Sequence, residues 1–179
     1  MRKLISYLFI SVDGVVEAPN RFLRADLYQD LDPLDLTLEE QDAVLLGRKT
    51  YEEWAAYWPG SDLQPFAGFI NAVPKHVVSR TLNDFGWTNS APLAGDLYGA
   101  VSAMKRQPGK AIGVHGSIGL VETLLDARLI DELKLVVCPA AAGQGRRLLA
   151  RDGEAIQLDL KSALTTPGGL HFLTYAPRN

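Results

Sequence analysis

The stretch that decides the fold is Lys110–Leu149, KAIGVHGSIGLVETLLDARLIDELKLVVCPAAAGQGRRLL. Its first apolar run, Ala111–His115, has the length of a strand, and Gly116 ends it. Four apolar residues then recur at helical spacing: Leu120, Val121, Leu124 and Leu125. A second apolar run, Leu133–Cys138, is typical of a strand that is covered on both faces. Strand, helix and strand in this order predict a right-handed βαβ crossover within a parallel sheet.

The rest of the chain supplies further strands for the same sheet. Leu4–Val12 is apolar on both alternating faces, which predicts a central strand. Ala43–Leu46 and Lys75–Arg80 are two shorter strand candidates. Two runs near the end of the chain, Leu158–Leu164 and Leu170–Tyr175, are separated by a Pro-Gly-Gly turn, so they predict an antiparallel hairpin at the sheet edge.

Helices are expected between these strands. Tyr51, Trp54 and Trp58 recur at helical spacing, and Asp96 is placed to cap a later helix. Thr37-Leu38-Glu39-Glu40 has the form of a capping box and predicts a short helix that begins at Thr37. Before it, Glu17–Leu36 is an irregular segment with the length of a functional loop.

Composition narrows the class of protein. A length of 179 residues suits one domain, 1–179, and a net charge of −3 gives no sign of a nucleic-acid footprint. Cys138 is the only cysteine, so a disulfide within the chain is impossible and a cysteine-based zinc site is not expected. No metal site is predicted, since the three histidines are scattered and each is expected to be structural. No apolar stretch is long enough to cross a membrane, and a cytoplasmic location is expected.

Glycine turns follow three of the predicted strands. Gly116-Ser117-Ile118-Gly119 opens a helix whose free N–H groups could bind a pyrophosphate, and Ser117 could cap that helix. Gly47-Arg48-Lys49-Thr50 opens another helix beside two cations, which favours a phosphate. Ser79-Arg80 ends a third strand with a hydroxyl and a guanidinium. Each turn alone could equally be a tight or basic turn that binds nothing.

Asp13-Gly14 ends the first strand. An Asp-Gly pair usually forms a turn, but the end of a central strand is also where an α/β sheet places its chemistry. Asp13 is therefore a candidate catalytic group, as a proton donor if burial raises its pKa or as a substrate ligand. Gly14, Glu17 and Asp26 are candidates for contact with the substrate.

The ordered set of motifs resembles the dihydrofolate reductase superfamily. The motifs are Ser11-Val12-Asp13-Gly14, Leu46-Gly47-Arg48-Lys49-Thr50-Tyr51-Glu52, Val78-Ser79-Arg80, Val114-His115-Gly116-Ser117-Ile118, Leu129-Ile130-Asp131-Glu132-Leu133 and Gly143-Gln144-Gly145-Arg146-Arg147. The set is most similar to the C-terminal reductase domain of bifunctional riboflavin-biosynthesis deaminase–reductases, in a stand-alone form. This resemblance implies a three-layer α/β fold: a mostly parallel sheet with an antiparallel C-terminal edge hairpin and helices on both faces.

The resemblance also implies a cofactor and its ligands. NADPH would lie across the strand ends, with its adenosine-side phosphates on Gly47, Arg48, Lys49 and Thr50. Its adenine and 2′-phosphate would lie near Ser79 and Arg80, and its pyrophosphate and nicotinamide near Gly116, Ser117, Ile118 and Gly119. The chain would then be an NADPH-dependent reductase of a nitrogen heterocycle or ribosylamine, similar to 5-amino-6-(5-phosphoribosylamino)uracil reductase, and a homodimer. A dihydrofolate or pterin reductase, or a non-catalytic dinucleotide-binding protein, is the alternative.

Overall fold

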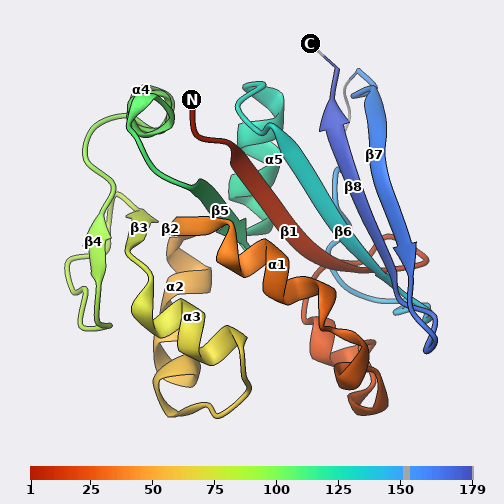
Figure 1. Cartoon of the computed structure of the whole chain (residues 1–179). Helices are drawn as coiled ribbons and strands as arrows, with labels where there is room; N and C mark the ends of the chain where they lie inside the picture. Colours follow the sequence, from red (N-terminus) through yellow and green to blue (C-terminus); the bar gives the residue numbers. More distant parts are fainter. Residues whose placement is uncertain (151–153, 179) are drawn as a thin grey trace.

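A single sheet of eight strands forms the centre of the molecule, as a computed structural model of residues 1–150 and 154–178 shows (Figure 1). The strand order is β4-β3-β2-β5-β1-β6-β8-β7. The strands are β1 (Leu4–Ser11), β2 (Gln41–Gly47), β3 (Lys75–Val78), β4 (Ser90–Pro92), β5 (Ala111–His115), β6 (Glu132–Cys138), β7 (Leu158–Thr165) and β8 (His171–Pro177). The strands β1 to β6 pair in parallel, whereas β8 pairs antiparallel with both β6 and β7. The predicted fold class, including the antiparallel hairpin at one edge, is confirmed.

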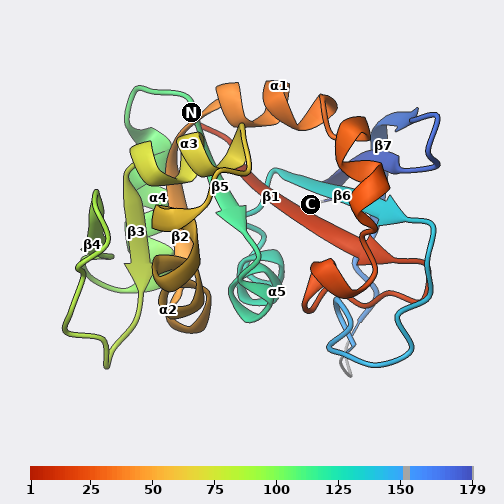
Figure 2. The same ribbon diagram turned by 90° about the horizontal axis from the view of Figure 1, so that it is seen from below.

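Helices cover both faces of the sheet. They are α1 (Pro33–Glu39), α2 (Arg48–Tyr57), α3 (Phe66–Ala72), α4 (Leu97–Arg106) and α5 (Ile118–Asp126), with short 3-10 turns at Pro19–Arg21, Ala25–Asp30 and Trp58–Gly60. Figure 2 shows α1 and α3 on one face and α2 and α5 on the other. On the α5 face, Leu4 and Leu8 of β1 pack with Leu124 of α5 in one buried cluster. On the α1 face, Tyr7 of the same strand packs with Leu34 and Leu38.

The helix cap predicted at Asp96 is confirmed, whereas the capping box predicted at Thr37 is wrong. The Asp96 carboxylate caps α4 by accepting a hydrogen bond from the Gly99 N–H at 2.9 Å. The expected capping box at Thr37 is not formed, because α1 begins at Pro33 and Thr37 lies buried within it. Proline is favoured at the first helical position, where its missing N–H costs nothing. Thr37 instead offers its carbonyl to the Gln41 side-chain amide at 2.8 Å.

Two elements were not expected from the sequence, α3 and the short strand β4. The helix α3 ends on a buried cation, since the Lys75 ammonium donates to the Ile70 and Val73 carbonyls at 2.8 and 2.9 Å. The same ammonium lies 4.6 Å from the centre of the Trp87 ring. Carbonyls at a helix C-terminus need such partners. Lys75 therefore stabilises a helix whose own sequence carries no strong cap.

His115, the last residue of β5, is fully buried in an aromatic environment. Its Nε2 lies 2.8 Å from the Gln41 Oε1, and its ring lies 5.5 and 6.0 Å from those of Phe66 and Phe69. Burial disfavours the charged imidazolium and lowers the pKa of His115 to about 4. His115 is thus neutral at physiological pH, with the structural contacts expected for it.

The buried histidine predicts a loss of stability in acid. An unfolded histidine takes up a proton below pH ~6.5, whereas folded His115 resists protonation down to pH about 4. The unfolded state binds more protons within this window, so stability falls as pH is lowered through it. The free energy of unfolding, measured with urea, is therefore expected to be lower at pH 5 than at pH 7.5, with ~2 kcal/mol of the difference due to this residue.

The control is His115→Leu, which cannot bind a proton. This variant is expected to be less stable at both pH values, because Gln41 loses its partner. Its stability difference between pH 7.5 and pH 5 should nevertheless shrink by the same amount. An unchanged difference would show that His115 is not the titrating group.

Candidate functional site

The three predicted turns lie side by side at the carboxyl edge of the sheet. The strands β3, β2 and β5 are neighbours, and Gly47 at the end of β2 pairs with Val78 at the end of β3. Gly47 also donates its N–H to the Ser117 hydroxyl across to the next turn, at 2.8 Å. Figure 2 looks onto this edge, with α2 and α5 starting from adjacent strands. Three segments separated by up to about 70 residues in the chain thus form one continuous surface.

Gly116 is the tightest point of this surface. Its φ of +64° is a left-handed conformation that side chains rarely adopt. A Cβ at this position would lie 3.0 Å from the Trp54 ring and 3.6 Å from the Thr50 methyl, both on α2. The turn after β5 therefore packs directly against the helix after β2, and only glycine fits between them.

The hydroxyls of this edge are used differently from the sequence-based expectation. Ser117 is the residue before α5, but its hydroxyl does not cap that helix, and it accepts from Gly47 instead. Ser79 accepts from the N–H groups of Thr81 and Leu82 at 3.2 and 2.9 Å, which makes it a turn former. The capping role predicted for Ser117 is wrong because tying two turns together takes up its hydroxyl.

The cations of the edge differ in their partners. Arg48 forms an ion pair with Glu52 one helical turn along α2, at 2.8 Å, and both side chains are about half exposed. Lys49 and Arg80 are exposed, and neither forms an ion pair with any residue in the ranges 1–150 and 154–178. Unpaired cations beside helix N-termini are suited to bind anionic groups.

A further guanidinium lies over the start of α5. Arg146 comes within 3.5 Å of the place where a Cβ on Gly119 would stand. It forms a close ion pair with Glu122 on α5, and Glu122 also accepts from the Leu149 N–H at 3.1 Å. The loop after β6 is therefore held against the Gly116–Gly119 turn by side-chain contacts.

Asp13 fixes that loop from the other side. Its carboxylate accepts from the Ser11 hydroxyl at 2.6 Å and from the N–H groups of Ala142 and Gly143 at 2.8 and 2.9 Å. The Arg147 guanidinium lies 3.3 Å from the same carboxylate and donates to the Asp13 carbonyl at 2.8 Å. Both oxygens of Asp13 are thus occupied within the protein.

These contacts oppose a role for Asp13 as a proton donor. The Ser11 hydroxyl, followed by the Ala142 N–H, lowers the pKa of Asp13 to about 2. The condition set for the proton-donor role, a pKa raised by burial, is not met, because the side chain is partly exposed and hydrogen bonds favour its charged form. Any other catalytic role of Asp13 stays a prediction.

The remaining candidates for substrate contact are also tied into local structure. Gly14 adopts a φ of +86° in the turn after β1, and Glu17 accepts from the Arg146 N–H at 2.9 Å. Asp26 pairs with Arg24 at 2.8 Å on an exposed 3-10 turn, and this pair lowers its pKa. Asp30 accepts from Gly168 in the β7–β8 turn at 2.6 Å. Of these residues, Glu17 is linked to the Gly116–Gly119 turn through Arg146, whose side chain lies over Gly119. The contacts of Asp26 and Asp30 are with Arg24 and with the β7–β8 turn instead.

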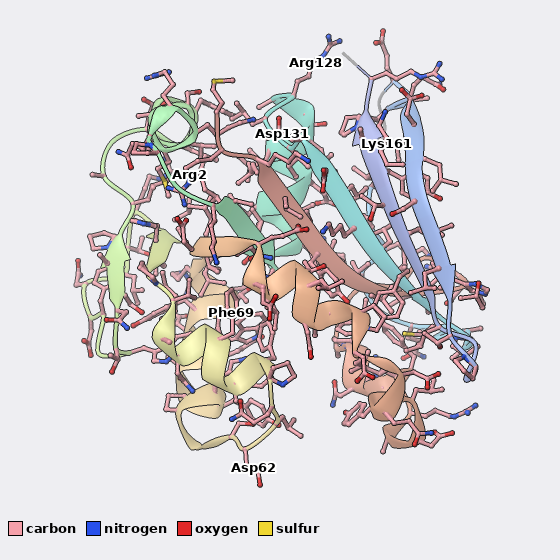
Figure 3. All side chains as sticks on the ribbon, in the orientation of Figure 1. Arg2, Asp62, Phe69, Arg128, Asp131 and Lys161 are labelled. Atoms are coloured by element: carbon pink, nitrogen blue, oxygen red, sulfur yellow. The ribbon has the colours of Figure 1, made fainter. Side chains whose placement is uncertain are left out.

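An aromatic cluster beside the Gly116 turn was missed by the sequence analysis. Its members come from β1, β5, α2, α3 and the turn between these helices: Tyr7, His115, Trp54, Phe66, Phe69 and Trp58. Figure 3 shows Phe69 on the side of α3 that faces α1. The helical spacing of Trp54 and Trp58 was visible in the sequence, but the ring from α3 that joins them to β5 was not.

Comparison with known proteins places the chain in a family. A family model described as the RibD C-terminal domain matches residues 2–172. The chain belongs to the RibD C-terminal domain family. Bacillus subtilis YyaP is 27% identical to it over 180 residues, which cover 97% of this chain and 94% of that protein.

Solved structures agree with the fold of this RibD C-terminal domain protein. A putative riboflavin biosynthesis protein from Shewanella sp. PV-4 has a TM-score of 0.77 at 16% identity, over 99% of both chains. Acinetobacter baumannii RibD has a TM-score of 0.64 at 15% identity, over 100% of this chain and 59% of that one. Enterococcus faecalis dihydrofolate reductase, solved with NADP(H), has a TM-score of 0.64 at 12% identity, over 99% of this chain and 97% of that one. At these identities the likeness shows the shared dihydrofolate reductase-like fold.

The contacts of Asp13 predict a structural effect on mutation. Asp13→Asn is expected to lower the melting temperature, because a neutral amide oxygen is a weaker acceptor for the Ala142 and Gly143 N–H groups. Amide hydrogen exchange at these two residues should accelerate. Asp159→Asn, which changes an exposed ion pair on β7, is the control. Unchanged exchange at both amides would contradict the proposed anchoring.

Proposed function

We propose that this protein is an NADPH-dependent reductase of a nitrogen heterocycle or ribosylamine. The observation that carries the proposal is the Gly47–Ser117 hydrogen bond, which joins two helix N-termini into one surface. Beside it lie Lys49 and Arg80, which form no ion pair with another described residue. Membership of the RibD C-terminal domain family supports a reductase of the riboflavin-pathway type.

The residues present fit the cofactor. Gly116 leaves a left-handed turn without a side chain, and the N–H groups at the start of α2 and α5 are suited to phosphates. Lys49, with Thr50 and Arg48, would hold the phosphates on the adenosine side. Ser79 and Arg80 would lie at the adenine and 2′-phosphate, and Gly116-Ser117-Ile118-Gly119 would hold the pyrophosphate and nicotinamide side.

The chemistry asked of the chain itself is modest. Bound NADPH supplies the hydride, so the protein positions both reactants and excludes water. Asp13, through Ala142, Gly143 and Arg147, keeps the loop after β6 in place beside the turns. No Asp or Glu among the described residues is buried.

The function is tested by turnover. NADPH consumption is followed with a panel of pterins, dihydrofolate and 5-amino-6-substituted uracils, with product identified by mass spectrometry. Reduction of an aminouracil or a ribosylamine supports the proposal, and reduction of dihydrofolate or a pterin alone supports the alternative reductase. NADPH binding without turnover of any compound would make the chain a dinucleotide-binding protein.

Arg80 is predicted to make the protein prefer NADPH to NADH. A charge-assisted hydrogen bond to phosphate contributes about 1.5–3 kcal/mol, or roughly 10- to 100-fold in affinity. Arg80→Ala is therefore expected to weaken NADPH binding by this factor in calorimetric titration and to leave NADH binding unchanged. Arg106→Ala, an exposed arginine in the last turn of α4, is the control and should change neither. Equal losses for both cofactors would show that Arg80 does not contact the 2′-phosphate.

We further propose that two copies pair through the hairpin edge. The strand β7 ends the sheet, and its Leu160 and Leu164 are 56% and 51% exposed. An exposed edge strand with apolar side chains is a ready partner for another chain. Light scattering at micromolar concentration is expected to give twice the 19.5 kDa mass of one chain. Leu160→Lys should shift this mass toward the monomer, and a wild type of 19.5 kDa at all concentrations would dismiss the dimer.

A further inference from the structure

Two buried hydrogen-bond donors in the aromatic cluster have no partner. The Tyr7 hydroxyl and the Trp58 indole N–H are both shielded from solvent, and no hydrogen bond to either is formed within the described residues. Two other unpartnered atoms, the hydroxyls of Ser6 and Ser90, lie outside this cluster. Buried polar groups are nearly always paired in native proteins, so an exception calls for a reason.

The position of Tyr7 suggests why its hydroxyl is left without a partner among the described residues. Tyr7 pairs in register with His115, and the next residue after His115 is Gly116. Tyr7 therefore lies one step below the turn that is proposed to hold the nicotinamide side of the cofactor. Its ring packs 6.1 Å from that of His115 and 5.8 Å from that of Phe9, and it is 5% exposed.

No described residue forms a hydrogen bond to this hydroxyl. The Nε2 atom of the neighbouring His115 is paired with Gln41, and the buried residues that pack in the same cluster as Tyr7 are apolar except for the weakly hydrogen-bonding thiol of Cys138. Burial also raises the pKa of the Tyr7 hydroxyl, which keeps it protonated and therefore able to donate. A phenylalanine would pack equally well at this position without an unpaired hydroxyl.

The aromatic rings around Tyr7 suggest which kind of ligand could accept a hydrogen bond from its hydroxyl. Phe66 lies 5.5 Å from Trp54, 4.8 Å from Trp58 and 5.5 Å from His115, so rings continue from the Gly116 turn toward Tyr7. Flat ligands bind well against such faces, and a few placed polar groups fix their orientation. Both unpartnered groups here are donors, which selects ligands that carry acceptors.

We propose that Tyr7 is a substrate-binding residue, whose hydroxyl donates a hydrogen bond to a carbonyl oxygen or ring nitrogen of a flat heterocycle lying against the aromatic cluster. The proposal rests on the proposed function, since it places the substrate beside the Gly116 turn. It narrows the substrate to planar rings with acceptors on their edge.

The test distinguishes a Tyr7 hydroxyl that binds a ligand from one that is merely buried. Tyr7→Phe is assayed with quinazoline-2,4-dione, a flat ring with two carbonyl acceptors, by calorimetry in saturating NADP⁺. Naphthalene, which has the same outline without acceptors, reports on shape alone. The matched control is Tyr51→Phe, because the buried Tyr51 hydroxyl already accepts from the backbone N–H of Trp87 at 3.2 Å.

The wild type is expected to bind the dione at least tenfold more tightly than naphthalene, and Tyr7→Phe should lose most of this preference. The melting temperature of Tyr7→Phe should stay equal or rise, because an unsatisfied hydroxyl is removed. NADP⁺ affinity should not change, and Tyr51→Phe should keep the preference. Unchanged dione binding in Tyr7→Phe, or no dione binding by a wild type that binds NADP⁺, overturns the role of Tyr7. Failure of the wild type to bind NADP⁺ would overturn the proposed function itself.

Discussion

The hydrogen bond from the Gly47 N–H to the Ser117 hydroxyl is the contact on which the organisation of the carboxyl edge depends. Parallel strands bring their carboxyl ends to one edge of a sheet, but side-chain contacts fix how the turns beyond them lie. Here one hydroxyl joins the turn after β2 to the turn after β5. Gly116 then packs under Trp54, which locks the start of α5 against α2. The two helix N-termini become neighbours and present their free N–H groups to the same space.

Both ends of the sheet carry ion pairs, but the carboxyl end also carries cations outside any ion pair of the described residues. At the amino-terminal edge, cations are paired: Arg2 with Asp42, and Lys105 with Asp131 at 2.6 Å. Figure 3 shows Arg2 and Asp131 at this edge, on the far side of the sheet from Asp62 in the segment before α3. At the carboxyl edge, Lys49 and Arg80 have no such partner among the described residues. The carboxyl edge also contains the ion pairs of Arg48, Arg146 and Arg147, so Lys49 and Arg80 are its cations that remain available for an anion.

Most of the sheet could be predicted from the sequence because its signals are local. The apolar runs, the glycine that ends β5 and the Asp96 cap all act within a few residues of themselves. The helix α3 could not, since Phe66–Ala72 includes a glycine and its last carbonyls depend on the buried ammonium of Lys75. The helix start predicted at Thr37 was wrong because a capping-box pattern also fits the end of a helix, and here the helix has already begun at Pro33.

The candidate site also combines features that local sequence predicts with features that only the fold shows. The turns at Gly47 and Gly116 could be found because a glycine between a strand and a helix is a local pattern. Ser11 is a local partner of Asp13, but Ala142 and Gly143 lie about 130 residues away, so its sequence neighbours alone could not show that both oxygens of this carboxylate are occupied. Tyr7 is the converse case: its sequence pattern is that of an ordinary strand residue, and only the fold shows that its hydroxyl has no hydrogen-bond partner among the described residues. Carboxylates drew attention in the sequence because they can donate or accept protons, yet here they fasten loops. Among the described residues, the groups left with unused hydrogen-bonding capacity include two aromatic donors, Tyr7 and Trp58. We therefore place the proposed recognition of substrate at Tyr7 in the aromatic cluster and not among the acids.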